Sequence, residues 1–289
     1  MPMAEAIQFI EKLSLLAFLV SSMVATGLSL DPRAALSALR DVRFVSIALA
    51  LNFLLAPALA LLLIRLIPLE KGLANGLLLL GGAAGAPFLP KLLAVAKADL
   101  ARGVALMALL TAGTIIFLPL ALPLEIPGVE ADPWRISRPL LGWIVVPLLV
   151  GVVANLVSPG QAIRAAPSLS NAAGGCMLLF FVLLVATNAK SLLALCGSGA
   201  LLAAALHAGI LFIAGWWLGG PSEDGRSVLG LGSGARNFGA AMVPATSSLR
   251  DPQALLMIAA SAVVGCLFCF SAAVWAKRRR IVTSTGLGL

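Results

Sequence analysis

Charged residues are scarce in this sequence. Lys and Arg number 20 and Asp and Glu 12, so only 11% of the 289 residues carry charge, whereas 61% are hydrophobic and the mean hydropathy is +1.06. A soluble domain cannot cover its surface with so few polar groups. We therefore interpret the chain as a polytopic membrane protein. Its formal net charge of +8 reflects basic residues in loops and at helix ends, and does not require a nucleic-acid partner.

Residues that bind metals or carry out catalysis are also few. The single histidine is His207, and the four cysteines lie in apolar runs without zinc-site spacing: Cys176, Cys196, Cys266 and Cys269. We interpret these cysteines as free packing thiols and expect no metal and no cofactor. An intramembrane hydrolase needs a serine with a histidine and an acid, or paired aspartates, at membrane depth. The segment "CGSGA" at 196–200 and His207 have no acidic partner, so we expect no enzyme.

Long hydrophobic runs dominate the chain instead. A bilayer-spanning helix needs about 20 apolar residues. Nine segments qualify: 9–30, 44–66, 72–96, 103–124, 138–158, 167–189, 192–218, 228–248 and 253–276. The first run, Leu13–Leu30, is too long for a signal-peptide core and is expected to stay as a helix. The sequence thus predicts one all-α membrane domain over residues 1–289.

The basic residues predict how this domain is oriented. Eleven of them fall on one side of the nine spans: Arg33, Arg40, Arg43, Lys97, Arg102, Arg164, Arg226, Lys277, Arg278, Arg279 and Arg280. Seven fall on the other: Lys12, Arg65, Lys71, Arg135, Arg138, Lys190 and Arg250. Because cytoplasmic loops are richer in Lys and Arg, we expect a cytoplasmic C-terminus, an outer N-terminus and residence in the cell membrane.

Two cations remain within predicted spans, and they point to an internal repeat. Lys91 follows "GLLLLGGAAGAPFLP" and Arg236 lies in "GLGSGARNFGAAM", two stretches that each combine small residues with a break. Proline is expected to interrupt the first (Pro87, Pro90), and glycine to loosen the second (Gly232, Gly234, Gly239). The two spans have opposite predicted directions. Such paired interrupted helices indicate an inverted-repeat transporter, with repeats over 9–124 and 138–276.

These stretches resemble the bile acid:sodium symporter family. The similarity rests on "MVATGLSLDP" at 23–32, "NFLLAPALA" at 52–60, "LLLLGGAAGAPFLPKLLAVAKADLARGVAL" at 77–106 and "GSGARNFGAAM" at 232–242. The resemblance implies a panel domain packed against a core domain, in which two discontinuous helices cross. It also implies that the first helix of a ten-helix arrangement is missing, leaving four spans in repeat one and five in repeat two.

The resemblance further implies a sodium site that this chain has largely lost. Sodium-coupled relatives carry an acidic residue, glutamines, a Ser-Asn pair and hydroxyls around the crossing. The corresponding positions here are Gly232, Arg236, Leu89, Pro90, Gly103, Met107 and Asn52, and only the motif asparagine is kept, as Asn237. Because a hard cation needs oxygen ligands, these differences argue against two-sodium coupling.

We therefore predict that Arg236 replaces a bound cation and keeps the site favourable for an anion. Lys91 has the same charge and, unlike arginine, can release its proton, so it is the better candidate for proton coupling. The predicted substrate- and ion-binding residues are Arg236, Asn237, Lys91, Pro90, Gly232, Ser233, Gly234, Asn52, Thr111 and His207. Structural alternatives stay open. Carbonyls can satisfy Arg236, Lys91 can snorkel to the interface, and His207 can form a helix–helix hydrogen bond.

The function that these features favour is secondary active transport of a small organic anion by alternating access. Sodium symport through backbone carbonyls, Asn52 and Asn237 is one alternative. A passive channel, which usually has pore-lining charge rings or a filter, is another, but the inverted repeat favours a transporter. The expected partners are the substrate and the lipid bilayer, with no nucleic acid and no obligate protein partner.

Overall fold

The computed structural model describes residues 3–284 except 31–32, 34–36, 38–39 and 127–132, and this part of the chain contains helices and no strand. Seven helical stretches in it are long and apolar enough to cross a membrane. They are α1 (Met3–Ser29), α3 to α4 (Val42–Leu66), α7 (Leu100–Glu125), α8 to α9 (Pro133–Val157), α10 (Pro159–Ala194), α11 (Ala200–Leu218) and α14 (Pro252–Ser284). The prediction of an all-helical membrane protein is confirmed.

Two of these stretches contain a π-helical turn ahead of a proline. The turn η1 (Leu51–Leu55) joins α3 (Val42–Ala50) to α4 (Ala56–Leu66), and η2 (Leu141–Val145) joins α8 (Pro133–Leu140) to α9 (Val146–Val157). Pro57 and Pro147 lie at the start of α4 and α9 and have no N–H for a helical hydrogen bond. Such π turns re-aim nearby side chains, and η1 contains Asn52.

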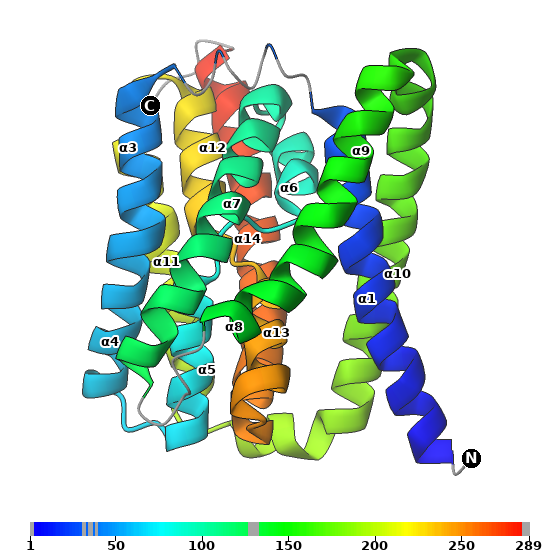
Figure 1. Ribbon diagram of the computed structural model, residues 1–289. Coiled ribbons are helices and arrows are strands. Elements are labelled where there is room, and N and C mark those ends of the chain that lie inside the picture. The colour runs from blue at the N-terminus through cyan, green and yellow to red at the C-terminus, as the bar shows by residue number, and fades with distance from the viewer. Residues whose placement is uncertain (1–2, 31–32, 34–36, 38–39, 127–132, 285–289) are drawn as a thin grey trace.

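Two further stretches are pairs of short helices. The first pair is α5 (Lys71–Gly82) and α6 (Leu89–Ala96), and the second is α12 (Glu223–Gly234) and α13 (Phe238–Pro244), which continues into η3 (Ala245–Leu249). Figure 1 shows the first pair rising from the lower end to α6 and the second descending from α12 to η3. Both predicted interruptions therefore exist, and the two pairs run in opposite directions.

Pro87 lies within the first break, at 83–88, as predicted, but the other expected residues do not lie in the breaks. Pro90 lies in the first turn of α6, where proline is tolerated, so it starts that helix instead of breaking one. Gly232 and Gly234 lie inside α12 and Gly239 inside α13, so the second break falls between the glycines, at 235–237. There Ala235 takes an extended conformation (φ −81°, ψ 119°).

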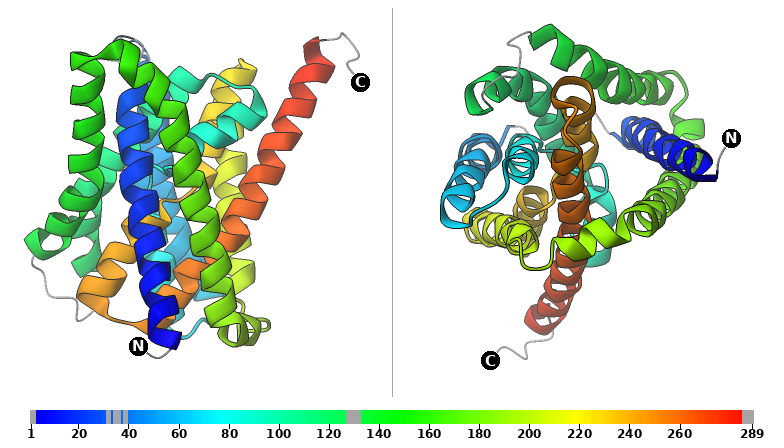
Figure 2. Two further views of the ribbon diagram at one scale, coloured as in Figure 1. Left: turned by 90° about the vertical axis from the view of Figure 1, so that its right-hand side faces the viewer. Right: turned by 90° about the horizontal axis from the view of Figure 1, so that it is seen from below.

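The helices form two groups. The panel group comprises α1, η2 to α9 and α10, which pack on one another, whereas α8 packs on α7 and α13. Figure 2 shows α1, α9 and α10 beside the remaining helices, here called the main bundle. Within the panel group, Gly27 of α1 and Gly151 of α9 face each other's backbone so closely that neither has room for a side chain. Small residues allow such close helix packing in membranes.

The chain ends and cysteines also bear on the sequence predictions. In Figure 1, α1 begins at the lower end of the molecule and α14 finishes at the upper end, so these helix ends lie on opposite sides.

The four cysteines are free thiols, as predicted, but their packing differs. Cys269 is buried, whereas Cys196 is exposed just beyond α10, so the prediction that all four are packing thiols is wrong for Cys196.

Candidate functional site at the helix crossing

Asn237 joins the two interrupted helices. Its backbone N–H donates to the carbonyl of Ala83 (3.0 Å), and its side-chain Nδ2 donates to the carbonyl of Gly85 (3.0 Å). Its Oδ1 accepts a hydrogen bond from Ala240 N (3.0 Å) and thereby caps the N-terminus of α13. Asn237 is completely buried. The asparagine of "ARNFGAA" thus caps the start of α13 and binds the backbone in the break between α5 and α6.

Two threonines of α7 hold the same break from the other side. Thr114 Oγ1 accepts from Ala84 N (2.8 Å) and donates to Ala84 O (3.0 Å), while Thr111 Oγ1 donates to Gly85 O (3.2 Å). Gly85 has a φ of +77°, a conformation that favours glycine. Thr111 was predicted as a site residue but Thr114 was not. The spacing of two threonines one helical turn apart in an apolar span was the available signal.

Arg236 is enclosed by oxygen atoms. Its Nε donates to Leu80 O (2.9 Å), and its terminal nitrogens donate to Gly81 O (2.6 Å) and Asn52 Oδ1 (2.7 Å). Leu80 and Gly81 end α5, whose last carbonyls carry partial negative charge. Arg236 is only 4% exposed. Its charge is thus directed at a half-helix C-terminus, the arrangement that the carbonyl alternative described.

Asn52 and Ser233 extend this network. Asn52 Nδ2 donates to Ala48 O (2.9 Å) and to Ser233 Oγ (3.3 Å), and both side chains are completely buried. The network therefore connects η1, α5, α12 and the break before α13. Three of the predicted residues, Arg236, Asn52 and Ser233, lie together, although none of their mutual contacts is local in sequence.

His207 shares a small space with Arg236. A space of about 10 Å³, enough for about one water, is lined by His207, Arg236 and Ser261, among others. The Nε2 atom of His207 lies 3.1 Å from Ala56 O, so His207 links α11 to α4. The buried hydroxyl of Ser261 has no hydrogen-bond partner among the described residues. His207 thus forms the helix–helix contact that was left open as an alternative.

Apolar side chains fill the positions where the resemblance expects sodium ligands. A Cβ atom added to Gly232 would lie 2.7 Å from Leu106 Cδ2 and 3.6 Å from Leu89 Cδ2. At Gly103, an added Cβ would collide with Leu93. Gly234 packs against Phe212 of α11, with an added Cβ 3.0 Å from the Phe212 Cβ. The surroundings of Gly232 and Gly103 are therefore hydrocarbon and not the oxygen atoms that a hard cation needs.

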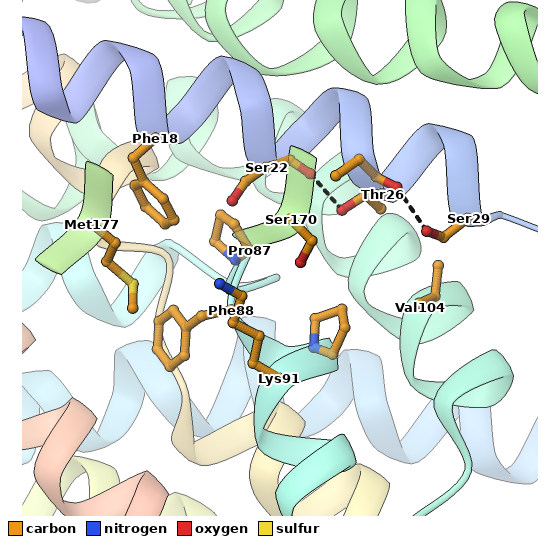
Figure 3. A pocket seen from close by; sticks show the side chains of 12 residues that line it. Phe18, Ser22, Thr26, Ser29, Pro87, Phe88, Lys91, Val104, Ser170 and Met177 are labelled. Carbon is orange, nitrogen blue, oxygen red and sulfur yellow. Dashed lines mark hydrogen bonds between the residues drawn. The ribbon is translucent and has the colours of Figure 1, made fainter. Parts of the chain in front are cut away.

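Lys91 lies on the opposite side of the crossing from this network. It extends from α6 toward α1 and α10 into a small cavity, with Ser22 and Ser170 across from it (Figure 3). Its Nζ is in contact with Gly174, where a side chain would displace it. Within the part of the chain that the structure describes, Lys91 has no hydrogen bond and no ion pair. The ammonium group is half-buried and unpaired.

A wider groove continues from this cavity between the panel group and the main bundle. It measures about 950 Å³, and Lys91 and Pro90 line both spaces. Asn155, Asn171, Ser29 and Ser170 add polar groups, and the rest of the lining is mostly apolar. Among the described residues that line the groove, Lys91 is the sole charged one. The predicted site residues thus divide between two places: Lys91 and Pro90 face the groove, and Arg236 faces the buried network.

Comparison with known families identifies the chain's relationship. A family model described as the Sodium Bile acid symporter family matches residues 16–195, more than half of the chain. The chain belongs to this family. No curated protein shows significant similarity to it. The match includes the first interrupted pair, α5 and α6, and ends before α12 and α13. Family membership makes this protein a membrane transporter of the bile acid/sodium symporter type.

Proposed function

We propose that this protein is a secondary active transporter that carries an organic anion across the cell membrane without sodium. In this proposal the two interrupted pairs complete a nine-span domain with inverted repeats over 9–124 and 138–276. The panel group is the panel and the main bundle is the core. The N-terminus lies outside and the C-terminus in the cytoplasm. Rocking of the core against the panel exposes the groove to each side in turn.

The unpaired ammonium of Lys91 is the observation that carries the proposal. A cation held away from bulk water without a counter-charge attracts an anion, and ionisable groups at membrane depth mark substrate pathways. Lys91 projects from α6, beside the helix break, and contacts Gly174 of α10 across the boundary between the two groups. A substrate carboxylate or sulfonate that binds Lys91 there contacts both groups at once, as alternating access requires.

The rest of the groove matches an anion with a sizeable apolar body. Its volume of about 950 Å³ suits a drug-sized ligand, and its lining combines apolar side chains with a few amides and hydroxyls. Leu156, Ile163 and Pro167 can pack against hydrocarbon, while Asn155 and Asn171 can bind hydroxyl or keto groups. Bile acids, steroid conjugates and small keto or hydroxy acids are the substrate classes we propose.

The environment of Arg236 supports sodium-independent operation. Two carbonyls and one amide oxygen surround the guanidinium as they would surround a bound cation. Arginine keeps its charge permanently, so this cation does not need to be bound and released in each cycle. In the proposal, Arg236 stabilises the crossing and Lys91 binds the anion. Lys91 also carries the coupled proton.

Ligand-dependent thermal stability tests the proposed function. The melting temperature of the purified protein is measured with taurocholate, oestrone sulfate and pyruvate, in sodium chloride and in choline chloride. We expect at least one anion to stabilise the protein equally in both salts, and Lys91→Gln to lose that stabilisation. Arg65→Gln serves as the control because it removes an exposed charge in the last turn of α4. Stabilisation that requires sodium, or that persists in Lys91→Gln, overturns the proposal.

A further inference from the structure

A second pocket between the panel group and the main bundle contains two arginines. It measures about 650 Å³ and is lined by α8, η2 and the end of α13–η3: Trp134, Arg138, Pro139, Gly142, Trp143, Ser247 and Arg250. Figure 1 shows α8 and α13 side by side in the lower half of the molecule, whereas α6, which carries Lys91, lies in the upper half. The two pockets are therefore separate and lie toward opposite ends of the protein.

Backbone geometry places the two arginines in this pocket. Arg138 lies in the last turn of α8, just before Pro139. Arg250 ends η3 in a left-handed conformation with φ of 50°, which turns the chain between η3 and α14. Gly142 has open space where a side chain would be, so the pocket is not filled from η2. The two arginines thus come from two different elements, α8 and η3, which contact each other.

No described residue neutralises the charges of the two arginines. Arg138 and Arg250 are exposed, and neither forms an ion pair or a hydrogen bond within the described residues. The nearest carboxylate in sequence, Asp251, instead accepts a hydrogen bond from Gln253 N (2.9 Å). Among the residues that the structure describes, no carboxylate lines the pocket. Within this part of the chain, the two guanidinium groups therefore share a hollow with nothing opposite in charge.

Two tryptophans complete the pocket. Trp134 is 62% exposed and Trp143 is 42% exposed, so both indoles present surface to a ligand. Indole faces bind apolar and aromatic bodies, and guanidinium groups bind carboxylates and sulfonates through charge-assisted hydrogen bonds. The combination suits an amphipathic anion with one acidic group and a ring system.

We propose that this pocket is a second binding site for amphipathic organic anions, at the end of the protein opposite the Lys91 groove. The acidic group binds between Arg138 and Arg250, and the ring system packs against Trp134 and Trp143. The bound anion thereby contacts η2 of the panel group as well as α8 and η3. The inference rests on the proposed function, since it assigns the pocket to the same class of substrate.

An anionic phospholipid headgroup shares part of this chemistry, because arginine and tryptophan also gather at membrane interfaces. The hollow form of the pocket and its position at the junction of two helix groups favour a soluble anion. Lipid binding is therefore treated as an outcome that contradicts the proposal.

The test uses dansyl-taurine, a fluorescent naphthalene derivative with a sulfonate. The full-length Lys91→Gln protein is titrated in an uncharged detergent, so that the groove contributes no cation. Fluorescence anisotropy reports binding, and energy transfer from tryptophan to dansyl reports proximity. We expect Arg138→Gln and Arg250→Gln each to weaken binding about tenfold. Arg65→Gln, which removes an exposed arginine elsewhere, should leave binding unchanged.

The tryptophans give an independent readout. Trp134→Phe with Trp143→Phe should reduce energy transfer at saturating ligand while anisotropy still detects binding. Equal binding by the Arg138, Arg250 and Arg65 variants overturns the proposal, as does complete displacement of dansyl-taurine by phosphatidylglycerol in mixed micelles. In either case the transport function stands if Lys91→Gln still abolishes the sodium-independent stabilisation. Binding in the pocket without any such stabilisation instead refutes the transport function alone.

Discussion

Arg236 donates a hydrogen bond to Asn52 Oδ1 at 2.7 Å and so links the second helix break to η1, the π turn between α3 and α4. The two residues are 184 positions apart. The same guanidinium donates to the carbonyls of Leu80 and Gly81 in the last turn of α5. One side chain therefore connects three elements that no local interaction would bring together.

Removal of this side chain should destabilise the protein. Arg236→Gln removes the donors to the buried Gly81 carbonyl and to Asn52 Oδ1, and each unsatisfied group costs about 1–3 kcal/mol. The Leu80 carbonyl keeps a hydrogen bond from Ala83 N (3.1 Å). We expect a loss of about 2–4 kcal/mol in the free energy of unfolding and a melting temperature lower by several degrees. Thermal unfolding in detergent measures it, with Arg65→Gln as the control. If both variants unfold at the same temperature, Arg236 does not stabilise the crossing.

The two threonines of α7 should differ in importance. Thr114 exchanges two hydrogen bonds with the Ala84 backbone, and Thr111 makes one with Gly85. Valine has nearly the same shape and no hydroxyl, so Thr114→Val should cost more stability than Thr111→Val, by about 1 kcal/mol. Denaturation of both variants side by side measures the difference. Equal losses would mean that the second hydrogen bond of Thr114 adds no stability.

The sequence predicts much of this architecture because its signals are strong and local. Apolar runs identify the long helices, and the stretches around Pro87 and Arg236 predict that two helices are interrupted. The residues at each interruption are not predictable in this way. Pro90 is compatible with either breaking or starting a helix. The break that precedes it is held by Asn237 and Thr114, which bind the backbone of Gly85 and Ala84 and are distant in sequence.

The residues of the candidate site are likewise predictable from the sequence, but their contacts are not. Sequence position alone places Arg236 and Lys91 in equivalent roles, since each is a lone cation in an interrupted span. The structure separates them because Arg236 meets the C-terminus of α5, whereas Lys91 meets Gly174 of α10. Neither partner is adjacent in sequence. Nothing in the sequence around Gly174 indicates that it lies against the Lys91 ammonium group.

Sodium should not affect this protein. An ion that binds the folded state at 100 times its Kd stabilises it by about 2.7 kcal/mol, so a sodium site would raise the melting temperature in sodium chloride relative to choline chloride. We expect equal melting temperatures. Gly232→Asp should not create a sodium response, because Leu106 Cδ2 fills the space 2.7 Å from the added Cβ, and it should lower stability. Gly160→Asp, at a position with open space, is the control.

The last prediction separates the charge of Lys91 from its proton. Lys91→Gln removes the charge, so anion uptake into proteoliposomes should fall by about tenfold or more. Lys91→Arg keeps the charge but cannot release a proton, so it should bind the anion and lose the stimulation that an inward proton gradient gives the wild type. Uptake of the stabilising anion is measured with and without a pH gradient. Lys190→Arg, an exposed substitution on α10, controls for the change of side chain. If Lys91→Arg still responds to the gradient, the proton is carried elsewhere. If Lys91→Gln transports normally, the anion does not bind at Lys91.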